Sequence, residues 1–386
     1  MRPLWLRRSR ASNARRRVGR AISSAALAAA LLPALVAADP AQGADSPMVI
    51  GVSSLPRHFD TDAEEVASVE SWLGQPFGVI RVFKQWDEPF PNPYESWALG
   101  TGHRLVVSLK SERLNGSPIK WDDIANATPG TGLHDYVAQL ATKIAALDQP
   151  VYFIFHHEPE VKGHEIYGEA PQFIAAWRNV VGIFRSAGAS NVKFMLTLTD
   201  HAYRVPVTDA RTADNWYPGD DYVDAIGADT YNWYNCRVVG GDWTSLELLL
   251  GGHRRFGERH PTKELWLPEL GSVEDPANPD RKATWFNDAR AMFKKAEWRQ
   301  YKGVIYFNSE HNNSRFPDCD WWLDSSDESI GAFGQWMNDP FFGGDGGTPP
   351  PPSIRIIDSI DRGGLGYKPA GRETPTTTMI TTTATT

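Results

Sequence analysis

The chain has 386 residues, of which 41% are hydrophobic, 22% charged and 11% aromatic, and its formal net charge is −8. This composition is typical of a globular protein and excludes a mainly disordered chain, a collagen and a coiled coil. The one apolar run long enough to span a membrane lies near the N-terminus, so the rest of the chain does not resemble a multi-pass membrane protein.

Residues 1–38 have the composition of a secretory signal peptide. Eight arginines and no acidic residue occupy residues 1–20, and the Ala/Leu/Val/Ser-rich stretch that follows ends in small residues suited to cleavage near Ala38. This order predicts export, with residues 39–47 as a short mature N-terminal segment. An uncleaved N-terminal anchor is the alternative interpretation.

Loss of the leader would make the protein strongly acidic. Removing its eight positive charges changes the formal net charge from −8 to −16. An acidic surface repels nucleic acid and anionic membranes, so a neutral partner is favoured. We therefore expect no nucleic-acid partner, no membrane contact after cleavage, and a monomer.

Eight short apolar runs follow along the chain, and each is continuous rather than alternating, as in strands buried on both faces. The runs are Val49–Val52, Gly78–Phe83, Leu105–Leu109, Val151–Phe155, Val192–Thr199, Ala225–Thr230, Leu265–Leu267 and Gly303–Phe307. Their starts are far enough apart for a crossover helix between successive strands.

Helical periodicity occupies several of the intervening stretches. These are Ala63–Leu73, Leu133–Leu147, Phe173–Phe184, Thr244–Phe256 and Ala283–Ala296. Repeated strand–helix alternation predicts an α/β protein with one (β/α)8 TIM barrel as its catalytic domain, over residues 48–341. A doubly wound open sheet is the alternative, but no Gly-rich phosphate-binding turn follows any of the runs.

The last part of the chain, residues 342–386, has a different composition. Glycines at 343, 344, 346 and 347 lead into four prolines at 349–352 and then into a Thr-rich end. This segment is predicted to be a linker and a disordered tail, because it is too small to hold a core of its own.

Two glutamates follow or end predicted strands on opposite sides of the barrel. Glu158 comes after the fourth run and Glu269 after the seventh. Reactive groups of such barrels lie at the carboxyl ends of the strands, so the two carboxyls should meet about 5–5.5 Å apart. One would be a protonated acid and the other an ionised nucleophile, which is the chemistry of retaining glycoside hydrolysis. Glu160 should point away from this pair, and Asp229 is interpreted as a rim hydrogen-bonding group.

Other side chains at the predicted strand ends fit a sugar-binding cleft. Tyr231 can donate a hydrogen bond to the nucleophilic carboxylate. Flat aromatic faces suit the C–H faces of sugar rings, and five tryptophans fall in the strand-end loops. The predicted substrate-binding tryptophans are Trp86, Trp121, Trp233, Trp321 and Trp322.

No metal or cofactor is expected. Histidines and glutamates cluster around residues 156–165, but the position that zincin spacing would require to be histidine is Val161. In an exported protein the two cysteines, Cys236 and Cys319, are expected to form a disulfide at the rim that carries Glu269, with two buried free thiols as the alternative.

These residues resemble glycoside hydrolase family 26, and the resemblance covers roughly residues 48–336. The segments that carry it are Phe155–Glu158, Ala176–Arg178, Trp216–Asp220, Tyr222–Asp224, Gly227–Asn232, Pro268–Gly271, Lys282–Phe286 and Asp320–Ser325. The resemblance implies that Glu158 is the acid/base, that Glu269 is the nucleophile and that Tyr231 supports it. It also implies that His157 orients Glu158 or touches the substrate.

Many family members are β-1,4-mannanases, so the resemblance implies an endo-glycosidase with β-1,4-mannan as the first expectation, and the leader adds that it is secreted. The chain departs from these mannanases at Phe153 and Ile154, and its segment 161–167 lacks tryptophan. Other substrates therefore stay open, namely β-1,3-xylan, mixed-linkage β-glucan and cell-wall polysaccharides. A non-catalytic carbohydrate-binding barrel is the alternative from another functional class.

Overall fold

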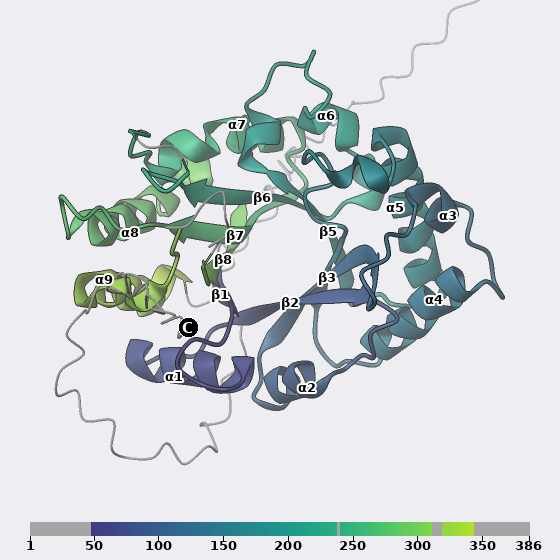
Figure 1. The fold of residues 1–386 in the computed structure, drawn as a ribbon, viewed down its shortest axis with the longest axis horizontal. Coiled ribbons are helices and arrows are strands. Elements are labelled where there is room, and N and C mark those ends of the chain that lie inside the picture. Colours follow the sequence, from purple (N-terminus) through teal and green to yellow (C-terminus); the bar gives the residue numbers. More distant parts are fainter. Residues whose placement is uncertain (1–47, 238–239, 311–318, 343–386) are drawn as a thin grey trace, which may run out of the picture. The chain divides into compact units, whose positions relative to one another are not determined.

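The computed structural model describes residues 48–237, 240–310 and 319–342 of the chain. In these residues eight parallel strands form a closed barrel in chain order, with β8 pairing back onto β1 (Figure 1). The predicted (β/α)8 barrel is therefore confirmed. The predicted leader, the segment 39–47 and all but the first residue of the predicted tail lie outside the described residues.

Each predicted apolar run overlaps one strand of the barrel. The strands are β1 (Val49–Ser54), β2 (Val79–Trp86), β3 (Arg104–Arg113), β4 (Val151–Phe155), β5 (Val192–Thr199), β6 (Ala225–Asn232), β7 (Glu264–Ser272) and β8 (Tyr301–Asn308). Strand β7 is longer than predicted, so Glu269 lies inside the strand rather than after it.

Helices surround the barrel, and the five predicted helical stretches all overlap α-helices. The α-helices are α1 (Asp62–Leu73), α2 (Pro93–Gly100), α3 (Trp121–Ala125), α4 (Gly132–Ala145), α5 (Ala170–Ser186), α6 (Ala213–Trp216), α7 (Leu246–Arg259), α8 (Arg281–Phe293) and α9 (Asp327–Met337). The 3-10 helices are η1 (His164–Ile166), η2 (Asp200–Tyr203), η3 (Asp220–Tyr222), η4 (Ala296–Trp298), η5 (Leu323–Ser325) and η6 (Pro340–Phe342).

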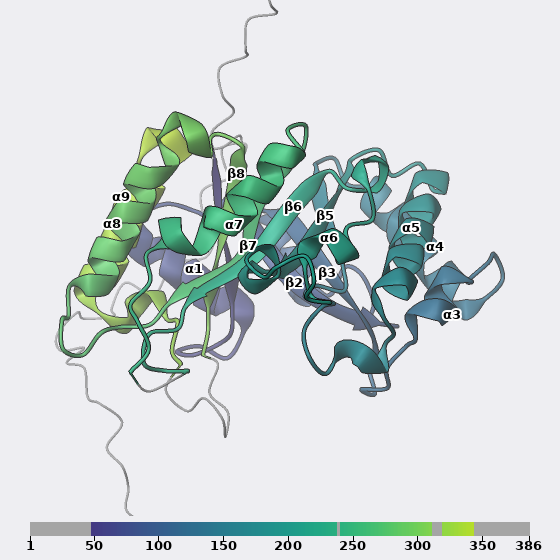
Figure 2. The same cartoon turned by 90° about the horizontal axis from the view of Figure 1, so that it is seen from above.

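Helix α4 illustrates why these segments are helical. Val137, Leu140, Ala141 and Ile144 recur at helical spacing and are buried on one face. The Thr131 hydroxyl accepts a hydrogen bond from the backbone N–H of His134 and so caps the first turn. In both views α4 lies beside α5, and α8 lies beside α9 (Figures 1 and 2). None of the described helices is long and apolar enough to cross a lipid bilayer.

The amino-terminal end of the barrel interior is filled by an apolar cluster to which all eight strands contribute. Its members are Val49, Val79, Val106, Tyr152, Ile154, Met195, Ala225, Trp266 and Ile305. Trp266 is the largest of them, and it fits because Gly303 has no side chain: a Cβ at Gly303 would lie 2.0 Å from the indole. This packed layer is the floor on which the side chains nearer the carboxyl ends of the strands rest.

Candidate active site

The two predicted glutamates meet at the carboxyl end of the barrel. Glu269 is buried within β7, and Glu158 lies half-buried in the turn that follows β4. A third carboxyl, from Asp229 on β6, joins them, and one oxygen from each of the three lies within 4.8 Å of the others. Strands β4, β6 and β7 therefore bring three acidic groups to one point.

The backbone around Glu158 is held in an uncommon conformation. His156 and Glu158 have φ angles of 48° and 51°, a left-handed region that costs non-glycine residues about 1 kcal/mol or more. Hydrogen bonds to two neighbouring strands fix the turn: His156 N–H donates to the Leu109 carbonyl, and Glu158 N–H donates to the Thr197 carbonyl. The direction of the Glu158 side chain is therefore set by strands β3 and β5.

An arginine in β2, which the sequence interpretation missed, connects the carboxyls. The buried Arg81 guanidinium donates to Glu269 Oε1 at 3.0 Å and lies 3.4 Å from Asp229 Oδ1. Its other terminal nitrogen donates to the Ser108 hydroxyl on β3. A charged residue inside the otherwise apolar run at residues 78–83 was the available signal, because a buried charge requires a partner.

Tyr231 makes the contact expected of it. Its hydroxyl donates to Glu269 Oε2 at 2.5 Å, so the Glu269 carboxylate has a donor on each oxygen. Gly271 leaves room for the phenol ring, because a Cβ there would lie 2.8 Å from a ring carbon of Tyr231. The glycine in the Pro268–Gly271 segment thus positions the tyrosine against the carboxylate.

Burial and charge raise the pKa values of two of the three carboxyls, those of Glu158 and Asp229. The pKa of Glu158 is raised well above its ordinary value, first by burial and then by the negative charge of Glu269. Burial and the Glu269 charge also raise the pKa of Asp229 well above its ordinary value. Both shifts favour the protonated form, and for Glu158 that is the form a general acid requires.

His157 is neutral at the site. Burial and the nearby Arg81 charge lower the pKa of His157 well below its ordinary value. Its ring lies edge-on to Phe83 of β2, with 5.3 Å between ring centroids. It therefore stands next to Glu158 in the chain as a neutral polar group.

Trp86 and Trp121 are corrections to the sequence interpretation. Both are fully buried, so neither offers a face to a sugar. A register irregularity between Lys84 and Trp86 accompanies the burial of Trp86, which packs against Phe155. Trp121 begins α3 and donates from its indole N–H to the Ser111 hydroxyl.

The other three tryptophans lie near the carboxyl ends of β6 and β8. Trp321 is buried behind Tyr231, with 4.8 Å between ring centroids, and Trp322 is buried beneath the Arg57 guanidinium. Neither therefore presents an open face to a ligand. Trp233 packs edge-on against Trp321 and is half-buried, so of the five it keeps the most surface available.

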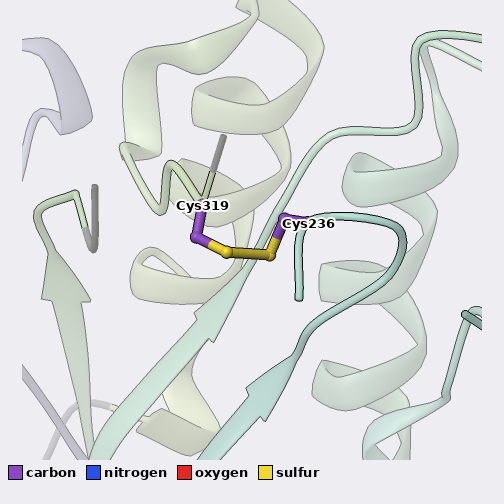
Figure 3. The surroundings of a disulfide bond; sticks show 2 residues. All are labelled: Cys236 and Cys319. Carbon is purple, nitrogen blue, oxygen red and sulfur yellow. A yellow bond between two sulfur atoms is a disulfide. The ribbon is translucent and has the colours of Figure 1, made fainter. Parts of the chain in front are cut away.

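The two cysteines are joined in a disulfide (Figure 3). They belong to a cluster against which Tyr231 also packs. Cys236 belongs to the segment after β6 and Cys319 to the segment after β8, and 83 residues separate them in the chain. The bridge packs with Val273 and Trp321. It therefore links the two segments that flank β7, the strand that carries Glu269.

Among the described residues, Glu158, Asp229 and Glu269 form the acidic cluster with a geometry that could ligate a metal ion. Arg81 already supplies a positive charge to Asp229 and Glu269 at this point. The guanidinium therefore supplies part of the positive charge that this acidic cluster requires.

Comparisons with known proteins point to one family. Residues 124–247, which include Glu158 and Tyr231 but end before Glu269, match the sequence model of glycosyl hydrolase family 26. Endoglucanase H of Acetivibrio thermocellus is 25% identical over 278 residues, or 69% of this chain. The match covers 28% of that relative, so the chain spans less than a third of its length.

Solved structures share the fold. A family 26 β-mannanase from Bacteroides ovatus matches with a TM-score of 0.55 and 16% identity, over 78% of this chain and 92% of that one. A modular endo-β-1,4-mannanase from Cellulomonas fimi matches with a TM-score of 0.54 and 17% identity, over 77% of this chain and 71% of the other. The chain is thus similar in sequence to glycosyl hydrolase family 26 over residues 124–247, and it shares the barrel fold of these two structures.

Proposed function

We propose that the chain is a retaining endo-glycosidase that cleaves a β-linked polysaccharide by double displacement. The observation that carries this proposal is the convergence of Glu158 and Glu269, whose oxygens approach within 4.8 Å. Retaining enzymes hold their carboxyls about 5–5.5 Å apart, whereas inverting enzymes need about 6.5–9.5 Å to admit a water. The short separation supports attack by a carboxylate rather than by water.

In the first step Glu158 donates its proton to the glycosidic oxygen while a Glu269 oxygen attacks the anomeric carbon. The bond between that carbon and the leaving oxygen breaks, and a glycosyl-enzyme ester forms. The raised pKa of Glu158 supports its role as the acid. Arg81 and Tyr231 hold the two Glu269 oxygens, so the carboxylate meets the substrate in one orientation.

In the second step Glu158, now ionised, takes a proton from water, and the water oxygen attacks the anomeric carbon. Glu269 leaves as a carboxylate, and the two inversions give net retention. Burial and the Glu269 charge favour the protonated form of Asp229. A neutral Asp229 leaves the Arg81 charge available to stabilise Glu269 each time it becomes a free carboxylate.

For the substrate, β-1,4-mannan remains the first candidate. Two proteins that share its fold, at 16% and 17% identity, are named mannanases, and these names support mannan. A β-glucan is the second candidate, because the 25% identical relative is named an endoglucanase. The catalytic steps are the same for both, so the choice depends on the walls of the cleft.

The test is product release from a polysaccharide panel. Mannan, glucomannan, mixed-linkage glucan, β-1,3-xylan and bacterial cell-wall polysaccharides are incubated with the protein, and products are identified by mass and by the anomeric signals in proton NMR. We expect the wild type to cleave internal bonds of the polysaccharide with retained anomeric configuration. We expect the Glu158→Gln variant to release no product. Binding without product release would favour the carbohydrate-binding barrel, and inverted products would contradict the double displacement.

Export from the cell is also part of the proposal. Its support is the arrangement of basic, apolar and small residues over residues 1–38. N-terminal sequencing of protein recovered from culture medium is expected to show a start near residue 39. Retention of the full chain in the membrane fraction would instead indicate an uncleaved anchor.

A further inference from the structure

Phe83 is an exposed aromatic ring at the mouth of the barrel. Among the described residues six large hydrophobic side chains are exposed, and Phe83, at 42%, is the aromatic one. Its strand neighbours Val82 and Lys84 are buried. An aromatic ring left open to water on a barrel strand costs hydrophobic free energy, so a binding role would explain it.

The ring contacts Arg81, which donates to Glu269, and His157, which precedes Glu158. Successive strand residues alternate between faces, so Phe83 shares the inward face of β2 with Arg81, nearer the carboxyl end. The Arg81 guanidinium carbon is 4.5 Å from the ring centroid, and Arg81 itself donates to Glu269. His157, which precedes the acid Glu158, lies edge-on to the same ring.

Polar side chains follow further along β2 and the neighbouring strand β3. Gln85, the next inward residue of β2, donates to Glu112 Oε1 of β3 at 2.8 Å. Lys110, also of β3, forms an ion pair of 2.9 Å with Glu112. An apolar platform beside fixed donors and acceptors is the usual composition of a sugar subsite, where C–H faces stack and hydroxyls form hydrogen bonds.

We propose that Phe83 stacks on the sugar ring whose anomeric carbon Glu269 attacks. This inference rests on the proposed function and supplies the platform that the sequence had assigned to Trp86 and Trp121. The link through Arg81 to Glu269 places the ring on the side of the attacked sugar rather than on that of the leaving group. Because that sugar stays bound in the glycosyl-enzyme, Phe83 contributes to both displacement steps.

The experiment compares Phe83→Ala, Phe83→Leu and Phe83→Tyr with Leu248→Ala, an exposed apolar control on α7. The probes are mannan, mixed-linkage glucan and the 2,4-dinitrophenyl glycosides of mannobiose and cellobiose. For the probes that the wild type cleaves, we expect Phe83→Ala to lower kcat/KM roughly 10- to 100-fold. Phe83→Leu should be intermediate, and Phe83→Tyr and Leu248→Ala should stay near wild type.

The aryl glycosides separate the two sides of the cleavage point, because their leaving group departs without a sugar subsite. We expect Phe83→Ala to lose as much with them as with the polysaccharide, and to slow hydrolysis of the glycosyl-enzyme in burst experiments. A loss confined to the polysaccharide would place Phe83 at the leaving-group sugar and overturn the proposal.

An indirect effect through Arg81 is distinguished by the pH profile. Loss of a sugar contact lowers kcat/KM by the same factor at every pH. Disturbance of Arg81 would instead shift the pH values at which kcat/KM rises and falls, and such a shift would contradict stacking. If the wild type releases no product, the proposed function fails. Whether Phe83 contacts a sugar at all is then read from retardation in polysaccharide gels: Phe83→Ala running like wild type overturns that contact, and weaker retardation supports the contact but not its place at an attacked sugar.

Discussion

The two ends of the barrel interior differ in chemistry although the same strands build them. At the amino-terminal end Val79, Val106 and Trp266 belong to an apolar cluster. Two or three residues further along the same strands stand Arg81, Ser108 and Glu269, which are linked by hydrogen bonds. One end buries apolar surface and stabilises the fold, whereas the other buries charge, which contributes little net stability but supplies reactive groups.

The largest expected effect is loss of turnover in Glu269→Ala. Removal of the nucleophile should lower kcat roughly 10⁴-fold or more, while the barrel stays folded because Asp229 still faces Arg81. Sodium azide should restore activity with an inverted glycosyl azide as product. Near-native turnover in this variant would contradict the assignment of Glu269.

At the amino-terminal end of the barrel interior, a substitution should lower stability and leave turnover nearly unchanged. Trp266→Ala should lower the free energy of unfolding by about 3–5 kcal/mol, because it leaves a cavity in the packed layer. Thermal melting should show a Tm lower by roughly 10 °C. Turnover per folded molecule at 25 °C should stay within a few-fold of wild type, and a turnover loss without a lower Tm would break the proposed separation of roles.

A buried carboxyl beside the site should make stability depend on pH. Burial raises the pKa of Glu160 from 4.5 to about 7. The folded state then keeps a proton that the unfolded chain releases, so the stabilising contribution is complete below pH 4.5 and is lost as pH rises through about 7.

Glu160→Gln should therefore reduce the fall in unfolding free energy between pH 5 and pH 8, by up to about 3 kcal/mol. Glu297→Gln, a surface substitution in η4, is the control. Urea denaturation at the two pH values gives the measurement. Equal falls in Glu160→Gln and in wild type would show that Glu160 titrates alike in both states.

The smallest effect is expected from Tyr231→Phe. It removes one donor to Glu269 but keeps the ring, so kcat should fall about 10- to 100-fold without a change in Tm. Gly271→Ala, whose new methyl group would collide with the Tyr231 ring, should lower kcat in the same direction. If kcat of Tyr231→Phe equals that of the wild type, Arg81 alone would be sufficient to orient Glu269.

Much of this arrangement could be predicted from the sequence. Continuous apolar runs indicated the strands, and the topology of a barrel is enough to bring the ends of β4 and β7 together. Arg81 was missed because its partners, Asp229 and Glu269, are 148 and 188 residues away, and strand spacing alone does not select them. Trp86 was misjudged because an irregularity in register, rather than alternation, accompanies its burial.

The left-handed residues on either side of His157 have a consequence for how the enzyme assembles. The turn that aims Glu158 is uncommon for non-glycine residues, and the bonds that hold it come from Leu109 on β3 and Thr197 on β5. A fragment ending before β5 would contain the proton donor but lack one of its two anchors. The Glu158 side chain therefore takes its orientation only after β3, β4 and β5 have all assembled in the barrel.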